Sequence, residues 1–236
     1  MLGGIVERMG AFVSLGGPVV FILLCVSVVS LAIAIMKFWQ FAVAGVGRHA
    51  GADAALSRWD AGDTSGALAR IRADRTLLGR IAANAMQASS RLDGNEDIEG
   101  VKERNAVEAE RQLHGLEKGF RALDAIVQLS PLLGLFGTVL GMIEAFRKLQ
   151  DAGNTVDPSL LAGGIWVALL TTAVGLAVAM PSSLVLTWFE ARVADERIAA
   201  EAAIAAVFAP RANHVVEAHQ PARAAMPVSG AVPDVL

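Results

Sequence analysis

The sequence predicts an all-α membrane protein with three transmembrane helices, and two observations lead to this prediction. Hydrophobic residues make up 54% of the chain and charged residues only 18%, with a mean hydropathy of +0.51, which is too apolar for an ordinary soluble domain. Three windows also reach the length of about 20 apolar residues that a membrane-spanning helix needs. They run roughly from Phe12 to Met36, from Leu123 to Phe146 and from Leu160 to Phe189. Their long apolar runs lack the alternation of barrel strands, so helices are expected to satisfy the backbone groups in lipid.

The positions of Lys and Arg predict the orientation of these helices. Residues 37–121 carry most of the cationic side chains, and Arg192 and Arg197 follow the third window. Loops rich in Lys and Arg stay on the cytoplasmic side, so the amino terminus is expected outside and the carboxyl terminus in the cytoplasm. Arg147 and Lys148 argue mildly the other way.

The windows divide the chain into seven predicted segments. These are an outer N-terminal segment with the first transmembrane helix (1–37), a cytoplasmic helical segment (38–122), the second transmembrane helix (123–147), a short periplasmic loop (148–159), the third transmembrane helix (160–189), a cytoplasmic helical extension (190–209) and a disordered tail (210–236).

The cytoplasmic parts show helical periodicity. Between Ala52 and Met86 apolar residues recur every three or four positions around a turn at "DAGD" (60–63), which predicts a short helical hairpin, followed by a loop at 91–100. From Leu113 to Val127 the same spacing leads directly into the second window, so one long helix is expected to begin in the cytoplasm and continue through the membrane. No strong helix breaker separates Phe189 from Pro210, which predicts that the third helix also projects into the cytoplasm.

Small residues form a stripe on one face of each of the last two predicted transmembrane helices. The members are Ser130, Gly134, Thr138, Gly141 and Ala145 in the second helix, and Gly164, Ala168, Thr172, Gly175 and Ala179 in the third. Such stripes allow helix backbones to approach closely in lipid, and on that interpretation the threonines are packing residues. Alternatively, Thr138 and Thr172 face a water-containing passage, where a hydroxyl can donate and accept hydrogen bonds and so carry protons. Both helices place a hydroxyl at a similar central depth, which favours the second interpretation.

The motif "SPLLGLFGTVLGMIEAF" (130–146), followed by "GGIWVALLTTAVGLAVAMP" (163–181), resembles the two pore helices of the ExbB, TolQ and MotA proton-channel family. The resemblance covers roughly residues 120–190. It implies a homo-pentamer of three-span subunits in the bacterial inner membrane, which encloses single-span helices of an ExbD-like or TolR-like partner with a membrane aspartate. By position in the motif, Thr138 and Thr172 correspond to the pore-lining threonines of the family, and Thr171 ranks second.

The resemblance implies a role in energy transduction. Three spans and a short chain are similar to ExbB or TolQ, whereas MotA-like subunits have four spans. The expected function is conversion of proton motive force into mechanical work for outer-membrane import through a TonB-like protein. The alternatives are a TolQ-like role in envelope maintenance through a TolA-like protein, and a non-conducting membrane scaffold. The sequence contains no "GxxxxGK[ST]" motif and no nucleophile constellation, so we expect no enzyme, and we expect no cofactor, metal or nucleic acid.

One residue departs from the family pattern. Relatives often carry a glutamate in the third span where this sequence has Val167, so no carboxylate of this helix is expected within the membrane. Secondary polar sites are Ser130, Asp124 at the cytoplasmic mouth of the second span, and Glu144 near its outer end. Glu144 precedes Arg147 and Lys148 by three and four residues and is expected to pair with them.

Overall fold

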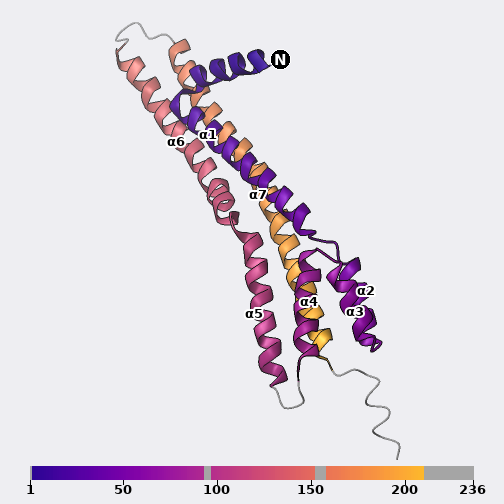
Figure 1. The fold of residues 1–236 in the computed structure, drawn as a ribbon. Helices are drawn as coiled ribbons and strands as arrows, with labels where there is room; N and C mark the ends of the chain where they lie inside the picture. Colours follow the sequence, from indigo (N-terminus) through magenta and orange to yellow (C-terminus); the bar gives the residue numbers. More distant parts are fainter. Residues whose placement is uncertain (1, 93–96, 152–157, 210–236) are drawn as a thin grey trace, which may run out of the picture.

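The computed structural model describes residues 2–92, 97–151 and 158–209 of the chain, and in these residues all regular secondary structure is helical (Figure 1). The all-α fold class is therefore confirmed. The helices are α1 (Leu2–Ala44), α2 (Ala50–Asp60), α3 (Thr64–Arg72), α4 (Leu77–Ser90), α5 (Ile98–Glu117), α6 (Phe120–Asp151) and α7 (Pro158–Phe208). The predicted disordered tail at 210–236 and most of the loop between the second and third spans lie outside the described residues.

Three of these helices are long and apolar enough to cross a membrane, which confirms the predicted three spans. Their membrane-spanning candidates are Gly17–Ala44, Phe120–Asp151 and Leu161–Phe208. The first begins at a kink, because Gly17 has a φ of 69° that only glycine adopts readily, and Pro18 then restarts the helix. Pro131 and Pro181 lie inside α6 and α7, which continue past them.

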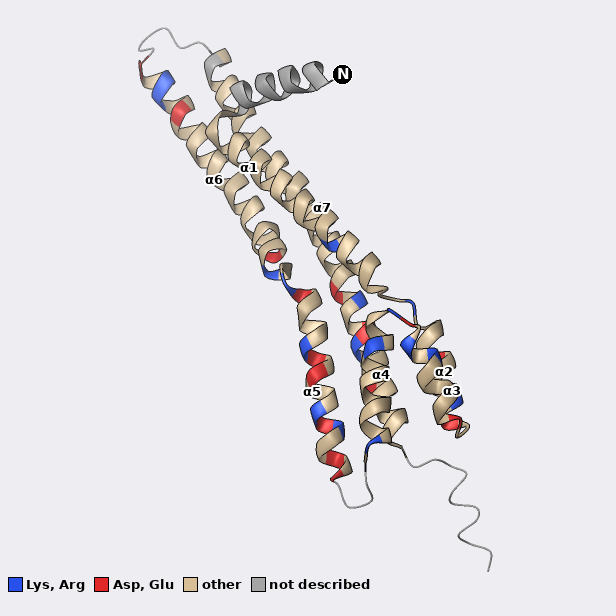
Figure 2. Ribbon diagram, viewed as in Figure 1, with Lys and Arg blue, Asp and Glu red and all other residues tan. Residues whose placement is uncertain are grey.

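Charge separates the molecule into two parts. Figure 2 shows that α1 and the neighbouring stretches of α6 and α7 are nearly free of charged residues, whereas α2 to α5 and the second half of α7 carry most of them. We call α2 to α5 together with the second half of α7 the helical extension. Helix α7 runs through both parts and contacts α1, α2, α4, α5 and α6.

The helical extension has its own apolar core. Trp59, Ile71 and Met86 from α2, α3 and α4 are almost fully buried, and they pack in one cluster with residues of α5, α7 and the end of α1. The predicted turn at 60–63 is present, with Gly62 at a φ of 86° and the Asp63 carboxylate accepting a hydrogen bond from the Gly66 N–H, which caps α3. Three short helices follow α1, however, instead of a single hairpin.

The expected continuous helix from the helical extension into the second span is wrong. Helix α5 ends at Glu117 and α6 begins at Phe120, with Gly119 between them at a φ of 96°. This left-handed conformation interrupts the helical hydrogen bonds between α5 and α6. The apolar spacing is maintained on both sides of the break, which is why periodicity alone gave no sign of it. The predicted loop at 91–100 is also shorter than expected, since α5 already begins at Ile98.

Helices α6 and α7 lie so close together that several contacts leave no space for a side chain. A Cβ atom added at Gly175 would lie 2.5 Å from the Ser130 carbonyl oxygen, and one added at Gly137 would lie 2.6 Å from the Thr171 Oγ1. Further along the pair, Gly141 faces Ala168 and Gly164 faces Ala145. The two predicted small-residue stripes thus meet each other, except that Gly137 lies at the contact in place of its neighbour Thr138.

The Gly175→Ala substitution is expected to destabilise the helix pair by about 1–3 kcal/mol, because its Cβ atom must displace the α6 backbone. Gly163→Ala is the matched control in the same helix, since a Cβ there meets nothing within 4 Å. The measurement is the free energy of unfolding of both variants in detergent. Equal stabilities of the two variants would contradict the close approach of α6 and α7.

Candidate ion-pathway site

Thr171 binds the two helices to each other. Its side chain is 2% exposed, and its Oγ1 lies 2.7 Å from the Ala168 carbonyl oxygen in its own helix and 3.1 Å from the Gly134 carbonyl oxygen in α6. The absence of side chains at Gly134 and Gly137 makes this approach possible. The Thr171 hydroxyl is therefore engaged in helix packing.

Thr172, the next residue, has an uncommitted hydroxyl. Its Oγ1 is buried but has no hydrogen-bond partner among the residues that the structure describes. A threonine within a helix commonly donates to the carbonyl one turn earlier, and a buried polar group without any partner is costly. This hydroxyl retains its full capacity to donate and accept. It is thus available for a hydrogen bond that the described residues do not supply.

Thr138 lies one turn from the same contact, on the other helix. It is half-buried, its Oγ1 donates to the Leu135 carbonyl oxygen at 2.6 Å, and it lines a groove of α6 with Met142, Phe146 and Arg147 among others. Gly134, one turn before it, faces Thr172, and Gly141, nearly one turn after it, faces Ala168. Thr138 and Thr172 therefore lie at a similar depth along the antiparallel helix pair. Thr138 lies on the surface of the pair, whereas Thr172 lies where the two helices are in contact.

The secondary polar sites are engaged within the chain. Ser130 is fully buried and donates to the Ile126 carbonyl oxygen at 2.6 Å, and Asp124 accepts a hydrogen bond from Gln128 at 2.8 Å. The predicted pairing of Glu144 is confirmed for Lys148, whose Nζ lies 3.5 Å from the Glu144 carboxylate. Both groups of this ion pair are more than half exposed, so it adds little stability.

The centre of the helix pair holds no carboxylate. Val167 is half-buried, and α7 carries no ionisable side chain from Leu161 to Phe189. In α6, the stretch between Asp124 and Glu144 is likewise free of charge. The central parts of α6 and α7 around Thr138 and Thr172 therefore contain no carboxylate. Among the described residues, no three His, Cys, Asp or Glu side chains are grouped to hold a metal ion.

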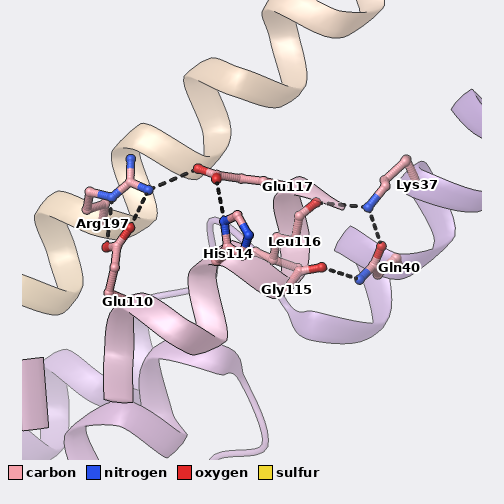
Figure 3. A network of polar contacts seen from close by, with 8 residues as sticks. All are labelled: Lys37, Gln40, Glu110, His114, Gly115, Leu116, Glu117 and Arg197. Atoms are coloured by element: carbon pink, nitrogen blue, oxygen red, sulfur yellow. Dashed lines mark hydrogen bonds and ion pairs between the residues drawn. The ribbon is translucent and has the colours of Figure 1, made fainter. Parts of the chain in front are cut away.

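The structure also contains a buried cation that the sequence analysis missed. Lys37, in α1, is 1% exposed, and its Nζ donates to the Leu116 carbonyl oxygen at 2.9 Å and to the Gln40 Oε1 at 2.8 Å (Figure 3). The Gln40 amide in turn donates to the Gly115 carbonyl oxygen. These carbonyls belong to the last turn of α5. The carbonyl groups of a last helical turn have no N–H partner within the helix, and they carry a partial negative charge. Lys37 and Gln40 thus cap α5 where the chain turns into α6.

A second network joins α5 to α7 a short distance away. Arg197 donates to both carboxylate oxygens of Glu110, at 2.8 and 3.0 Å, and to Glu117 at 2.9 Å (Figure 3). The hydrogen bonds from Arg197 hold the pKa of Glu110 below its ordinary value. These partners are about 80 residues apart in sequence, so no local pattern could have identified them.

A buried acid lies next to this network. Glu196 is 2% exposed, accepts a hydrogen bond from the Gly47 N–H, and lies 2.9 Å from the Nε2 of His49. It ties the segment between α1 and α2 to α7. An acidic residue among the alanines of α7 was the only sign of it in the sequence.

The helix lengths and the charge-free span centres define the protein as a polytopic α-helical membrane protein. The model of the MotA/TolQ/ExbB proton channel family matches residues 73–202, more than half of the chain, and the protein belongs to this family. This confirms the resemblance of the two helix motifs.

Individual relatives match over shorter stretches. The chain is 45% identical over 73 residues to the biopolymer transport protein exbB1 of Vibrio cholerae, which covers 31% of this chain and 32% of that protein. It is 32% identical over 123 residues to the biopolymer transport protein ExbB of Salmonella typhimurium, covering 50% of each. It is 36% identical over 101 residues to the Tol-Pal system protein TolQ of Pseudomonas aeruginosa, covering 43% of each. The matches thus span half or less of the length of these relatives.

The different surroundings of the two adjacent threonines have a measurable consequence. Thr171→Val is expected to lower the free energy of unfolding by about 1 kcal/mol, because it removes a buried hydrogen bond between α6 and α7. Thr172→Val removes a hydroxyl without a partner and is expected to leave stability unchanged or slightly higher. The two variants are compared by unfolding of the purified subunit without other proteins. A larger loss for Thr172→Val would contradict the assignment.

Proposed function

We propose that this protein is the channel-forming subunit of a proton-driven complex in the bacterial inner membrane, where it assembles as a homo-pentamer around an ExbD-like or TolR-like single-span partner. The observation that carries the proposal is the buried, unpartnered hydroxyl of Thr172 in a span centre without carboxylates. A hydroxyl can relay a proton but does not ionise near neutral pH, so the titrating acid is assigned to the partner. Family membership supports the same conclusion.

In the proposed mechanism Thr138 and Thr172 line the proton pathway, and Thr171 holds the helices that carry them. A proton that crosses the membrane releases about 2.3 kcal/mol per 100 mV. Protonation neutralises the partner's aspartate, which can then move past the apolar wall formed by residues such as Val167, and deprotonation on the other side resets it. The subunit would act as the fixed frame and the partner as the moving part, without any covalent chemistry.

The proposed orientation places the amino terminus in the periplasm and the helical extension in the cytoplasm. Its support is the concentration of Lys and Arg in the helical extension and after α7 (Figure 2). The energised process is proposed to be outer-membrane import through a TonB-like protein. An ExbB-named relative with 45% identity favours this role, and the TolQ-named relative with 36% identity supports envelope maintenance through a TolA-like protein as the second candidate.

The double substitution Thr138→Val with Thr172→Val is expected to reduce partner-dependent proton flux at least about tenfold. A tenfold reduction corresponds to an increase of only about 1.4 kcal/mol in the barrier to proton transfer, which the loss of two hydroxyl groups is expected to reach. The measurement is proton flux into vesicles that contain the subunit and its partner. Thr138→Ser with Thr172→Ser keeps both hydroxyls and is expected to retain most of the flux. Thr187→Val, an exposed position near the end of the span, is the matched control. Undiminished flux in the double valine variant would contradict the assignment of Thr138 and Thr172 to the pathway, whereas the absence of partner-dependent flux from the native protein would favour the non-conducting scaffold.

Val167→Glu tests whether the absent acid limits conduction. A carboxylate at this depth costs about 3 kcal/mol on insertion scales, so the variant is expected to be less stable than the native protein. If the partner acid and the hydroxyls suffice, flux in the same vesicle assay remains within about twofold of the native value. A large gain in flux would show instead that the native pathway lacks a group it needs.

A further inference from the structure

A cavity of about 820 Å³ opens where α1, α4 and α5 meet, at the boundary between the membrane-spanning part and the helical extension. It lies outside the helix pair that carries Thr138 and Thr172, and the proposed function does not use it. Cavities of this volume commonly accommodate small ligands. One part of its lining, called here the apolar wall, comes from α1, and another part, the cationic wall, contains two arginines.

The apolar wall comes from the end of the first span. Met36, Trp39 and Val43 line the cavity, and their side chains are 56%, 72% and 69% exposed. They continue the exposed apolar surface of α1 that includes Leu31 and Ile35. Tryptophan is enriched where a membrane meets water, so this wall lies at the depth where lipid chains join their head groups. The wall is therefore accessible to an acyl chain in the same membrane leaflet.

The cationic wall is formed by Arg75, just before α4, and by Arg80 in its first turn. Neither guanidinium has an ion pair or a side-chain hydrogen bond to any residue that the structure describes. No acidic residue lines the cavity, and the neighbouring Asp74 accepts a hydrogen bond from the Thr76 N–H. Two unpaired guanidinium groups next to an apolar wall match a phosphate that is attached to lipid chains.

A third group selects among anionic head groups. The Gln112 side chain lines the same cavity, and its Oε1 atom is buried without a hydrogen-bond partner among the described residues. It can only accept a hydrogen bond, so an unprotonated phosphate oxygen cannot satisfy it. A hydroxyl group beyond the phosphate can donate to it once rotation of the side-chain amide turns the oxygen towards the cavity. Buried Lys37 donates to the Gln40 side chain at 2.8 Å and to the Leu116 carbonyl oxygen, and because both of these residues line the cavity it adds positive potential there.

We propose that this cavity binds an anionic phospholipid whose head group carries a hydroxyl, of the phosphatidylglycerol class. The phosphate lies between Arg75 and Arg80, the head-group hydroxyl donates to Gln112, and an acyl chain lies along Met36, Trp39 and Val43. The lipid therefore contacts the end of α1 together with α4 and α5 and ties the helical extension to the membrane surface. A second copy of this chain fits less well, because it would have to bring acidic side chains to both arginines.

The proposal is tested with the full-length protein in vesicles of phosphatidylcholine and phosphatidylglycerol at 3:1. After extraction in mild detergent, the lipids that remain bound are measured by mass spectrometry. The native protein is expected to retain phosphatidylglycerol several-fold above its share of the vesicle, and Arg75→Gln with Arg80→Gln is expected to lower this enrichment about tenfold. The matched control is Arg58→Gln with Arg72→Gln, two exposed arginines outside the cavity, which is expected to retain the native enrichment.

Further binding experiments identify which part of the lipid the cavity recognises. Phosphatidic acid, which lacks the extra hydroxyl, is expected to be retained several-fold less than phosphatidylglycerol, and Gln112→Leu is expected to remove this preference but leave anionic lipid bound. Soluble glycerol phosphate at millimolar concentration is expected not to compete, because it lacks the chains. Unfolding curves verify that each variant is folded, and Arg75→Lys with Arg80→Lys, which keeps the charge, is expected to retain more lipid than the glutamine pair.

Three results would overturn the proposal. The first is no enrichment of phosphatidylglycerol by the native protein, and the second is equal enrichment in the Arg75→Gln and Arg80→Gln double variant and in the control. The third is an efficient disulfide between two copies of a Trp39→Cys variant, which would show that a second copy fills the cavity. None of these results depends on proton flux, so the lipid site and the proposed channel are tested separately.

Discussion

The close approach of α6 and α7 is the constraint on which the proposed site depends. In lipid, burial of apolar side chains supplies no driving force between helices, so backbone proximity and a few hydrogen bonds must hold them together. Gly137 admits the Thr171 side chain, and Gly175 admits the Ser130 carbonyl. With Thr171 committed to this contact, the hydroxyl of Thr172, the next residue along α7, is left uncommitted. The same packing that stabilises the pair thus determines which hydroxyl is available.

Helix α7 extends this constraint beyond the membrane. It is a continuous helix of 51 residues, and its far half holds the segment after α1 through Glu196 and holds α5 through Arg197. The break between α5 and α6, at Gly119, is fixed by Lys37 from α1, which caps the end of α5. These contacts hold the membrane-spanning helices and the helical extension to each other, so a force on the membrane-spanning helices is resisted by both parts. The proposed role as the fixed part of an ion-driven complex requires this resistance.

The sequence predicted those features that depend on local composition and period. The three spans follow from apolar length, and the meeting of the two stripes follows from small residues at helical spacing. Gly137 was missed because it fits the spacing of three and four residues between Gly134 and Gly141 as well as Thr138 does, so the spacing alone could not choose between these two neighbours. The break at Gly119 and the capping by Lys37 depend on each other across about 80 residues, and neither could be predicted without the other. For the same reason the partners of Arg197 and Glu196 were missed.

The absence of a central carboxylate gives the proposed complex a division of labour. A side chain that stores a proton must change charge within the accessible pH range, and in the hydrocarbon region the charged form is costly. Threonine hydroxyls do not ionise in this pH range, so a span centre that consists of Thr138, Thr172 and Val167 remains uncharged throughout the proposed transport cycle. Such a wall cannot by itself distinguish the two sides of the membrane or be driven by the proton gradient. In the proposed mechanism the charge that responds to the gradient therefore lies on the partner that moves, and this subunit provides the unchanging surface against which the partner's acid is neutralised and released.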